Sequence, residues 1–123
     1  MSIFHDQAEF LKAGDVKVPS SGLKGVLLAE TLVEEEFKEW QEEDTHFPLP
    51  NHDKIKEALD LMYVCAQYLN VTLGPDKAKE CWDLVHQNNM SKCTDGKLVK
   101  REDGKILKPK NYTKVNLGEV LYA

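Results

Sequence analysis

Four carboxylates in the middle of the chain have the residue types and the spacing of a cation site. Glu36 and Glu39 are three residues apart, and so are Glu57 and Asp60. Residues three apart lie on one face of an α-helix, so each pair presents its two carboxylates together. If the two faces meet, four like charges converge, and a hard cation such as Mg²⁺ with oxygen ligands would hold them there.

The two pairs also lie at one height if the chain folds back as an antiparallel helical hairpin. In such a hairpin, the numbers of residues at the same height have a constant sum. Glu36 is then level with Asp60, and Glu39 is level with Glu57, with the fold-back centred on Pro48. We therefore expect the four acids to share one volume.

Two long helices have to position these acids, and they form the predicted acidic hairpin of about residues 21–71. The first helix is expected from Ser21 to about Asp44. The second is expected from Asp53 to about Val71, with Asn51 as its N-cap. Two prolines in residues 45–50 prevent the first helix from continuing into the second.

Each long helix also carries an apolar stripe that is typical of a core face. Leu32 is level with Val64, which predicts an apolar floor beneath the acids. The stripes consist of Leu23, Val26, Leu27, Val33, Phe37 and Trp40 on the first helix, and of Ile55, Leu59, Met62, Tyr63, Ala66 and Leu69 on the second.

The rest of the chain predicts one more helix on each side of the hairpin and a short β-hairpin after it. The helix before the hairpin is expected over residues 3–13, between a Ser2 cap and Gly14. The helix after it is expected over about residues 75–90. A basic tail of about residues 95–112 would form two strands, Lys97–Lys100 and Lys105–Lys108. The expected fold is all-α, an antiparallel helical bundle with a short C-terminal β-hairpin, in a single domain of residues 1–123.

Charge is distributed unevenly along the chain. Its 123 residues carry a net charge of -5, which argues against binding of nucleic acid or a membrane surface by the whole protein. Residues 30–60 hold eleven acids and three lysines, whereas residues 92–110 hold seven bases and three acids. One part would hold cations and the other would meet phosphates.

Cysteine usage and the N-terminal sequence predict a location in the reducing cytoplasm. The three cysteines, Cys65, Cys81 and Cys93, show neither a zinc-binding spacing nor an even count for a disulfide framework. The chain has no apolar run long enough to cross a membrane, and its start lacks the layout of a signal peptide.

The acidic motif and a run downstream of it resemble one known superfamily. Glu36-x-x-Glu39 followed by Glu57-x-x-Asp60 is similar to the signature of the all-α nucleoside triphosphate pyrophosphohydrolases, and Glu35 before the first pair strengthens the likeness. Residues 85–92 (VHQNNMSK), 95–97 (DGK) and 101–109 (REDGKILKP) resemble the small, single-domain MazG-like proteins of bacteria and phages. The resemblance covers roughly residues 21–112.

This resemblance implies hydrolysis of a (deoxy)nucleoside triphosphate to the monophosphate and pyrophosphate. Mg²⁺, for which Mn²⁺ could substitute, would be held by Glu36, Glu39, Glu57 and Asp60. It also implies a homo-oligomer, a dimer or tetramer, in the cytoplasm of a bacterial or phage-infected cell. By the family pattern the phosphates or the sugar would be contacted by Asn89 and Lys92, with Lys97, Lys105 and Lys108 of the basic tail as further candidates.

Three other interpretations remain open at this stage. Phosphoribosyl-ATP pyrophosphohydrolase is the nearest enzymatic alternative within the superfamily. A non-enzymatic helical interaction module could use the same acids as a charged surface for a basic partner. A di-iron carboxylate protein is suggested by Glu43-x-x-His46 and Asp83-x-x-His86, because such bundles use Glu-x-x-His pairs.

Overall fold

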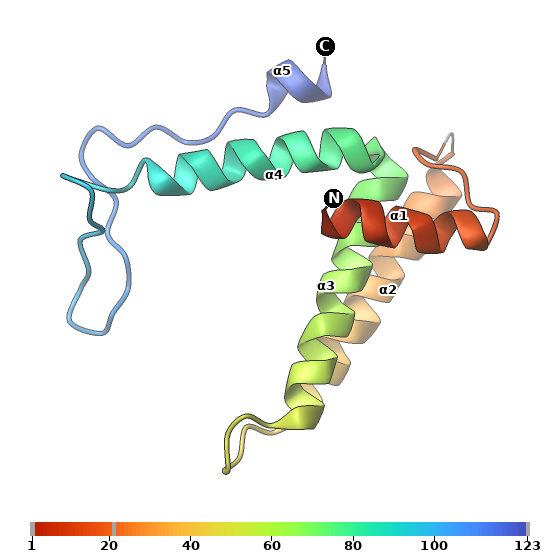
Figure 1. Ribbon diagram of the computed structural model, residues 1–123, viewed down its shortest axis with the longest axis horizontal. Helices are drawn as coiled ribbons and strands as arrows, with labels where there is room; N and C mark the ends of the chain where they lie inside the picture. Colours follow the sequence, from red (N-terminus) through yellow and green to blue (C-terminus); the bar gives the residue numbers. More distant parts are fainter. Residues whose placement is uncertain (1, 21, 123) are drawn as a thin grey trace. The chain divides into compact units, whose positions relative to one another are not determined.

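The computed structural model describes residues 2–20 and 22–122, and it is mostly helical (Figure 1). The five helices in the described part are α1 (Ile3–Ala13), α2 (Leu23–Glu42), α3 (His52–Leu73), α4 (Pro75–Met90) and α5 (Gly118–Leu121). The all-α class is confirmed. The contacts divide the chain into two compact units, Met1–Ala78 and Lys79–Ala123, each described by itself below. The prediction of a single domain stays a prediction.

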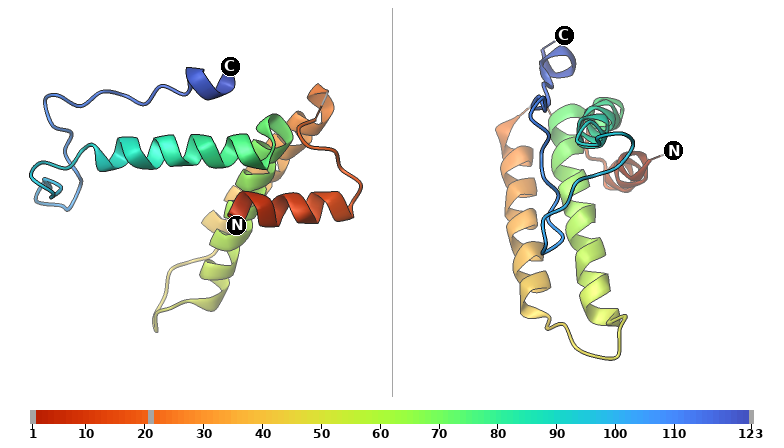
Figure 2. Two further views of the ribbon diagram at one scale, coloured as in Figure 1. Left: turned by 45° about the horizontal axis from the view of Figure 1, so that its top comes forward. Right: turned by 90° about the vertical axis from the view of Figure 1, so that its left-hand side faces the viewer.

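The first unit is built on the hairpin of α2 and α3, which lie side by side (Figure 2). The helix ends fall within about two residues of the predicted ones, except that the predicted start at Ser21 lies outside the described residues. Asn51 caps α3 as predicted, since its side-chain oxygen accepts hydrogen bonds from the backbone N–H groups of Asp53 and Lys54. Gly74 ends α3 with a φ of 84°, a conformation that favours glycine.

Helix α1 packs on the second half of α3. Its N-cap is Ser2, and Gly14 follows its last residue, as predicted. Asn70 and Gln7 are both fully buried between the two helices, and the Asn70 amide donates to Gln7 Oε1 at 2.8 Å. The same amide donates to the backbone oxygen of Phe4 at 2.9 Å. These bonds fix α1 to α3, and periodicity alone did not predict them.

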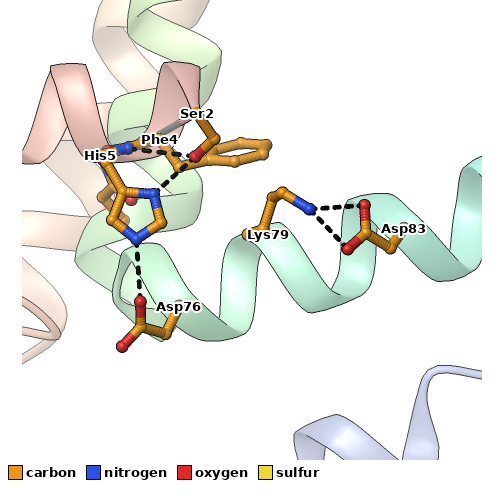
Figure 3. Close-up of polar contacts among 7 residues, drawn as sticks. Ser2, Phe4, His5, Asp76, Lys79 and Asp83 are labelled. Atoms are coloured by element: carbon orange, nitrogen blue, oxygen red, sulfur yellow. Dashed lines mark hydrogen bonds and ion pairs between the residues drawn. The ribbon is translucent and has the colours of Figure 1, made fainter.

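Two small apolar clusters complete the core of this unit. One contains Leu11, Ala29 and Val71, so it joins all three helices at the end of the hairpin away from its loop. The other contains Phe4, Ala66 and Ala78. Near it, the His5 ring forms hydrogen bonds between Nδ1 and Ser2 Oγ at 2.7 Å and between Nε2 and Asp76 Oδ1 at 2.8 Å (Figure 3).

Most residues of the predicted core stripes are exposed, and for these the prediction was wrong, whereas Ala66 is buried and Val26 and Leu69 pack against the core. A helix in a pair can bury only the strip that faces its neighbour, so a wide apolar stripe extends beyond the contact. On α3, Leu59 is 59% exposed, and on α2, Leu23 is 69% exposed. Five further members of the stripes are exposed: Leu27, Phe37, Ile55, Met62 and Tyr63.

The second unit consists of most of α4 and the tail that follows it. Helix α4 has the predicted bounds. The tail contains isolated antiparallel bridges, Thr94 with Lys97 and Lys100 with Ile106, and the described residues form no extended strand. The predicted β-hairpin of Lys97–Lys100 and Lys105–Lys108 is therefore not confirmed. Backbone hydrogen bonds from Arg101 N–H to Lys105 O and from Leu107 N–H to Val99 O lie on either side of the second bridge.

Among the residues described, no helix combines the length and the apolar character that crossing a lipid bilayer requires.

Candidate metal centre

Helices α2 and α3 bring three of the four predicted carboxylates together. One carboxylate oxygen from each of Glu36, Glu39 and Glu57 lies within 4.8 Å of the others. This is the convergence that the hairpin register predicts, and we call these three residues the acidic cluster. Glu39 is exposed, while Glu36 and Glu57 are half-buried. The cluster thus has an open side through which a ligand could approach.

Two oxygens of the cluster are buried without a hydrogen bond. They are Glu36 Oε2 and Glu57 Oε2, for which the described part of the chain supplies no partner. A buried carboxylate oxygen without a donor is costly, because it loses its hydration and gains nothing in return. A divalent cation with oxygen ligands would compensate a carboxylate oxygen of this kind. The residues present therefore fit a Mg²⁺ or Mn²⁺ ion.

Electrostatics within the cluster act most strongly on Glu36. Its pKa is raised above the ordinary value of 4.5, first because burial disfavours its charged form. A hydrogen bond to Glu39 and the negative charges of Glu39, Asp60 and Glu57 raise that pKa further. Without a cation, the folded protein therefore holds the Glu36 proton more tightly than the unfolded chain does.

Asp60 lies beside the cluster but already has a partner. Lys56, one turn earlier on α3, places its Nζ 2.5 Å from Asp60 Oδ2 and 3.7 Å from Glu57 Oε1. The hydrogen bond to Asp60 raises the pKa of Lys56, and the negative charges of Asp60, Glu57 and Glu36 raise it further. The predicted role of Asp60 as a metal ligand stays a prediction. Sequence reasoning missed Lys56, although its spacing of four residues from Asp60 was visible.

The loop end of the hairpin is fixed by a second lysine. Lys54 Nζ donates to the backbone oxygens of Trp40 at 2.5 Å and Glu43 at 2.7 Å, and it lies 4.0 Å from the centre of the Trp40 ring. These oxygens belong to the C-terminal end of α2, where a cation is favourable. The contact holds α2 and α3 in register next to Glu39 and Glu57.

The five predicted phosphate contacts all lie in the second unit, and the structure gathers two of them. Lys92 and Lys108 place their ammonium groups 5.7 and 5.4 Å from the centre of the Tyr112 ring. Tyr112 itself donates to Asn88 Oδ1 at 2.6 Å, which fixes the ring against α4. Asn89, Lys97 and Lys105 are exposed and lie outside this group. Sequence reasoning missed both Tyr112 and Asn88 as organisers of the basic tail.

The two motifs of the di-iron interpretation lie in different units of the chain, so that interpretation stays a prediction. In the described residues, the one group of three or more side chains close enough to hold a metal is the acidic cluster, which contains no histidine. His46 is exposed in the loop after α2. Asp83 is instead paired with Lys79 on α4.

A groove on another part of the first unit lacks a comparable set of ligands. Its volume is about 550 Å³, and its one thiol, Cys65, has a pKa raised by burial. The groove is lined by Glu30, Val33, Glu34, Cys65, Tyr68 and Leu69. Because no predicted site residue lines it, the chemistry favours the acidic cluster over this groove.

Comparison with known proteins adds no assignment. No protein-family model matches the chain. No curated protein matches it either.

Proposed function

We propose that the protein is a Mg²⁺-dependent nucleoside triphosphate pyrophosphohydrolase of the MazG-like type. The observation that carries this proposal is the convergence of three carboxylates from two helices, with two buried oxygens that lack a hydrogen-bond donor. The likeness of the acidic motif and of residues 85–109 to the MazG-like proteins supports it. The proposal includes a helical bundle of the MazG-like type. It also includes Mn²⁺ as a metal that can substitute for Mg²⁺.

Glu36, Glu39 and Glu57 would hold the cation, and Asp60 would join them when released by Lys56. When bound, the cation would neutralise triphosphate oxygens and lower the pKa of a water molecule for attack on phosphorus. Glu39 is the exposed member of the cluster, so its carboxylate is the one most open to an incoming nucleotide. The half-buried Glu36 and Glu57 would fix the position of the ion, because their neighbours limit their movement.

The basic tail would contact the phosphates or the sugar of the substrate. Lys92 and Lys108 are the better supported candidates, because Tyr112 holds both ammonium groups near one ring. Asn89, Lys97 and Lys105 lie in the same unit as Lys92 and Lys108, and their side chains are exposed to an approaching ligand. A (deoxy)nucleoside triphosphate is the substrate class that suits both the acids and the bases.

The same proposal includes a homo-oligomer, a dimer or tetramer. Exposed apolar side chains on α2 and α3 support it, since a group of large apolar residues on a helix face is typical of a protein interface. Sedimentation velocity should show a dimer or a tetramer at micromolar concentration. A monomer under these conditions would contradict this part of the proposal and leave the chemistry untouched.

Turnover of a panel of nucleotides tests the function directly. The protein is incubated with Mg²⁺ and each canonical ribo- and deoxyribonucleoside triphosphate, with phosphoribosyl-ATP as a further substrate, and products are identified by mass spectrometry. We expect monophosphate and pyrophosphate in equal amounts. Glu57→Gln should lower kcat at least about 100-fold, because one charged ligand of the cluster is lost.

The control is Glu34→Gln, which removes an exposed carboxylate of the same helix pair outside the cluster. It should leave kcat within about two-fold of the wild type. If the folded wild-type protein turns over none of these substrates, the enzymatic proposal is wrong, and a non-enzymatic interaction module becomes the better interpretation.

A further inference from the structure

Lys56 is a positive charge built into the edge of the acidic cluster. Its ammonium contacts Asp60 at 2.5 Å and lies 3.7 Å from Glu57, so it interacts with two of the four predicted ligands at once. Lys56 also has a favourable charge interaction with Glu36, a third predicted ligand. The Lys56 ammonium thus partly neutralises the carboxylates that a bound cation would otherwise neutralise.

The Lys56–Asp60 pair contributes little to the stability of helix α3. Lys56 is 59% exposed and Asp60 is 36% exposed, and ion pairs at that exposure are screened by water and salt. The order, with the base four residues before the acid, is also the weaker one along a helix. What the pair does change is local charge, because the ammonium offsets one of the four negative charges, that of Asp60, which lies outside the acidic cluster.

We propose that Lys56 is a displaceable internal counter-ion: it holds Asp60 while the cluster is free, releases it to an incoming divalent cation, and then binds a phosphate oxygen of the substrate. This inference rests on the proposed function, because it assumes a metal site at the cluster and a polyphosphate ligand. Lys56 would be a substrate-positioning residue that neither the motif nor the basic tail includes.

The charges in the cluster give this exchange its direction. A dication bound by the four carboxylates satisfies Asp60 and repels the nearby ammonium, so Lys56 loses its partner. Its flexible four-carbon side chain can then turn to another anion. A triphosphate coordinated by the same ion brings anionic oxygens to that place, and an ammonium is well suited to bind them.

Metal binding without substrate provides the first test. Mn²⁺ is titrated into the metal-free full-length protein and followed by calorimetry and by the electron paramagnetic resonance signal of free Mn²⁺. Lys56→Gln removes the competing charge, so it should bind Mn²⁺ about three- to ten-fold more tightly than the wild type. Lys56→Met should do the same, and Lys56→Arg, which keeps the charge, should resemble the wild type.

Helix α4 offers a matched control. Lys79 and Asp83 form the same kind of pair four residues apart, with an Nζ–Oδ2 distance of 2.7 Å and similar exposure (Figure 3). None of the predicted metal ligands lies on this helix. Lys79→Gln should therefore leave the affinity for Mn²⁺ within about two-fold of the wild type.

Binding of inorganic tripolyphosphate to the Mn²⁺-saturated protein provides the second test. Here the effect has the opposite sign, because Lys56 now contributes a phosphate contact. Lys56→Gln should weaken tripolyphosphate binding about ten-fold, which corresponds to one lost charge-assisted hydrogen bond. Lys56→Arg should recover most of that affinity. A residue that only stabilised α3 would move neither quantity.

The outcomes separate this inference from the function on which it rests. Wild-type protein that binds no Mn²⁺ contradicts the proposed function at its metal site. Wild-type protein that binds Mn²⁺, with either affinity unchanged in Lys56→Gln, overturns the inference about Lys56 alone. Circular dichroism of each variant confirms that the helices are intact.

Discussion

Replacing Glu36 with glutamine should stabilise the metal-free protein and make it less stable than the wild type once Mg²⁺ is added. The carboxylate oxygens of Glu36, Glu39 and Glu57 lie within 4.8 Å of one another. Two unit charges at that distance repel by about 0.9 kcal/mol in water and by about 3.5 kcal/mol at an effective dielectric constant of 20. Glutamine has nearly the same shape as glutamate, so the substitution removes charge without leaving a cavity.

The metal-free effect follows from this repulsion. Glu36→Gln removes its interactions with two neighbouring carboxylates, and since the site is half-exposed we expect a gain of about 1–2 kcal/mol in the free energy of unfolding. For a chain of this length that gain raises Tm by about 3–8 °C. Thermal unfolding in EDTA at neutral pH, followed by circular dichroism, measures it.

The effect of pH has a defined sign. The pKa of Glu36 is higher in the folded protein than its ordinary value of 4.5, so the folded state holds that proton more tightly than the unfolded chain. The stability that protonation contributes is complete below the unfolded pKa and is lost as pH rises through the folded pKa. Without metal, the advantage of Glu36→Gln should therefore grow from pH 4.5 upward and then level off.

Mg²⁺ should reverse the order of the two proteins. A ligand at about 100 times its Kd stabilises the folded state by about 2.7 kcal/mol, and this gain goes mainly to the protein with the intact cluster. The control is Glu35→Gln, an exposed neighbour on the same helix outside the cluster, which should respond to Mg²⁺ as the wild type does. The reasoning is refuted if Glu36→Gln destabilises the protein in EDTA, or if Mg²⁺ stabilises both variants equally.

Two further predictions concern the contacts that hold the hairpin. Lys54→Met removes the ammonium that binds the backbone oxygens of Trp40 and Glu43, and it should lower the free energy of unfolding by about 1–2 kcal/mol in urea titrations. Lys54→Arg should cost less, because it can still donate to these oxygens. Asn70→Leu deprives the buried Gln7 Oε1 of its donor and should cost about 2–4 kcal/mol in the same assay. Equal stability of Asn70→Leu and the wild type would show that the Asn70 hydrogen bonds do not contribute to the docking of α1.

The hairpin and its acids could be predicted from sequence because both depend on short-range rules. Two prolines in the loop prevent a continuous helix, and Asn51 supplies a cap. Once the fold-back is placed, a constant sum of residue numbers fixes which carboxylates are level. The convergence of Glu36, Glu39 and Glu57 follows from that register.

Other features depend on partners that periodicity does not identify. Leu59 and Met62 belong to a stripe with the pattern of a core face, yet both are exposed, and α1 buries the stripe at Ala66. The bond between Asn70 and Gln7 joins residues 63 positions apart, and polar residues in helices give no sign of such a pairing. Lys56 was missed because the carboxylates were considered as ligands and not as partners of a nearby ammonium.

The contacts that hold the hairpin together are separate from the acids that the proposed chemistry uses. At the loop end, Lys54 binds backbone oxygens of α2, and at the other end Asn70 and Val71 anchor α3 to the rest of the unit. The acidic cluster lies between these two anchors, and its mutual repulsion opposes the close approach of the helices. Neutralising one acid therefore leaves both anchors in place and relieves strain between them. Loss of activity in a variant such as Glu57→Gln would then report on chemistry, because the expected change in folding has the opposite sign.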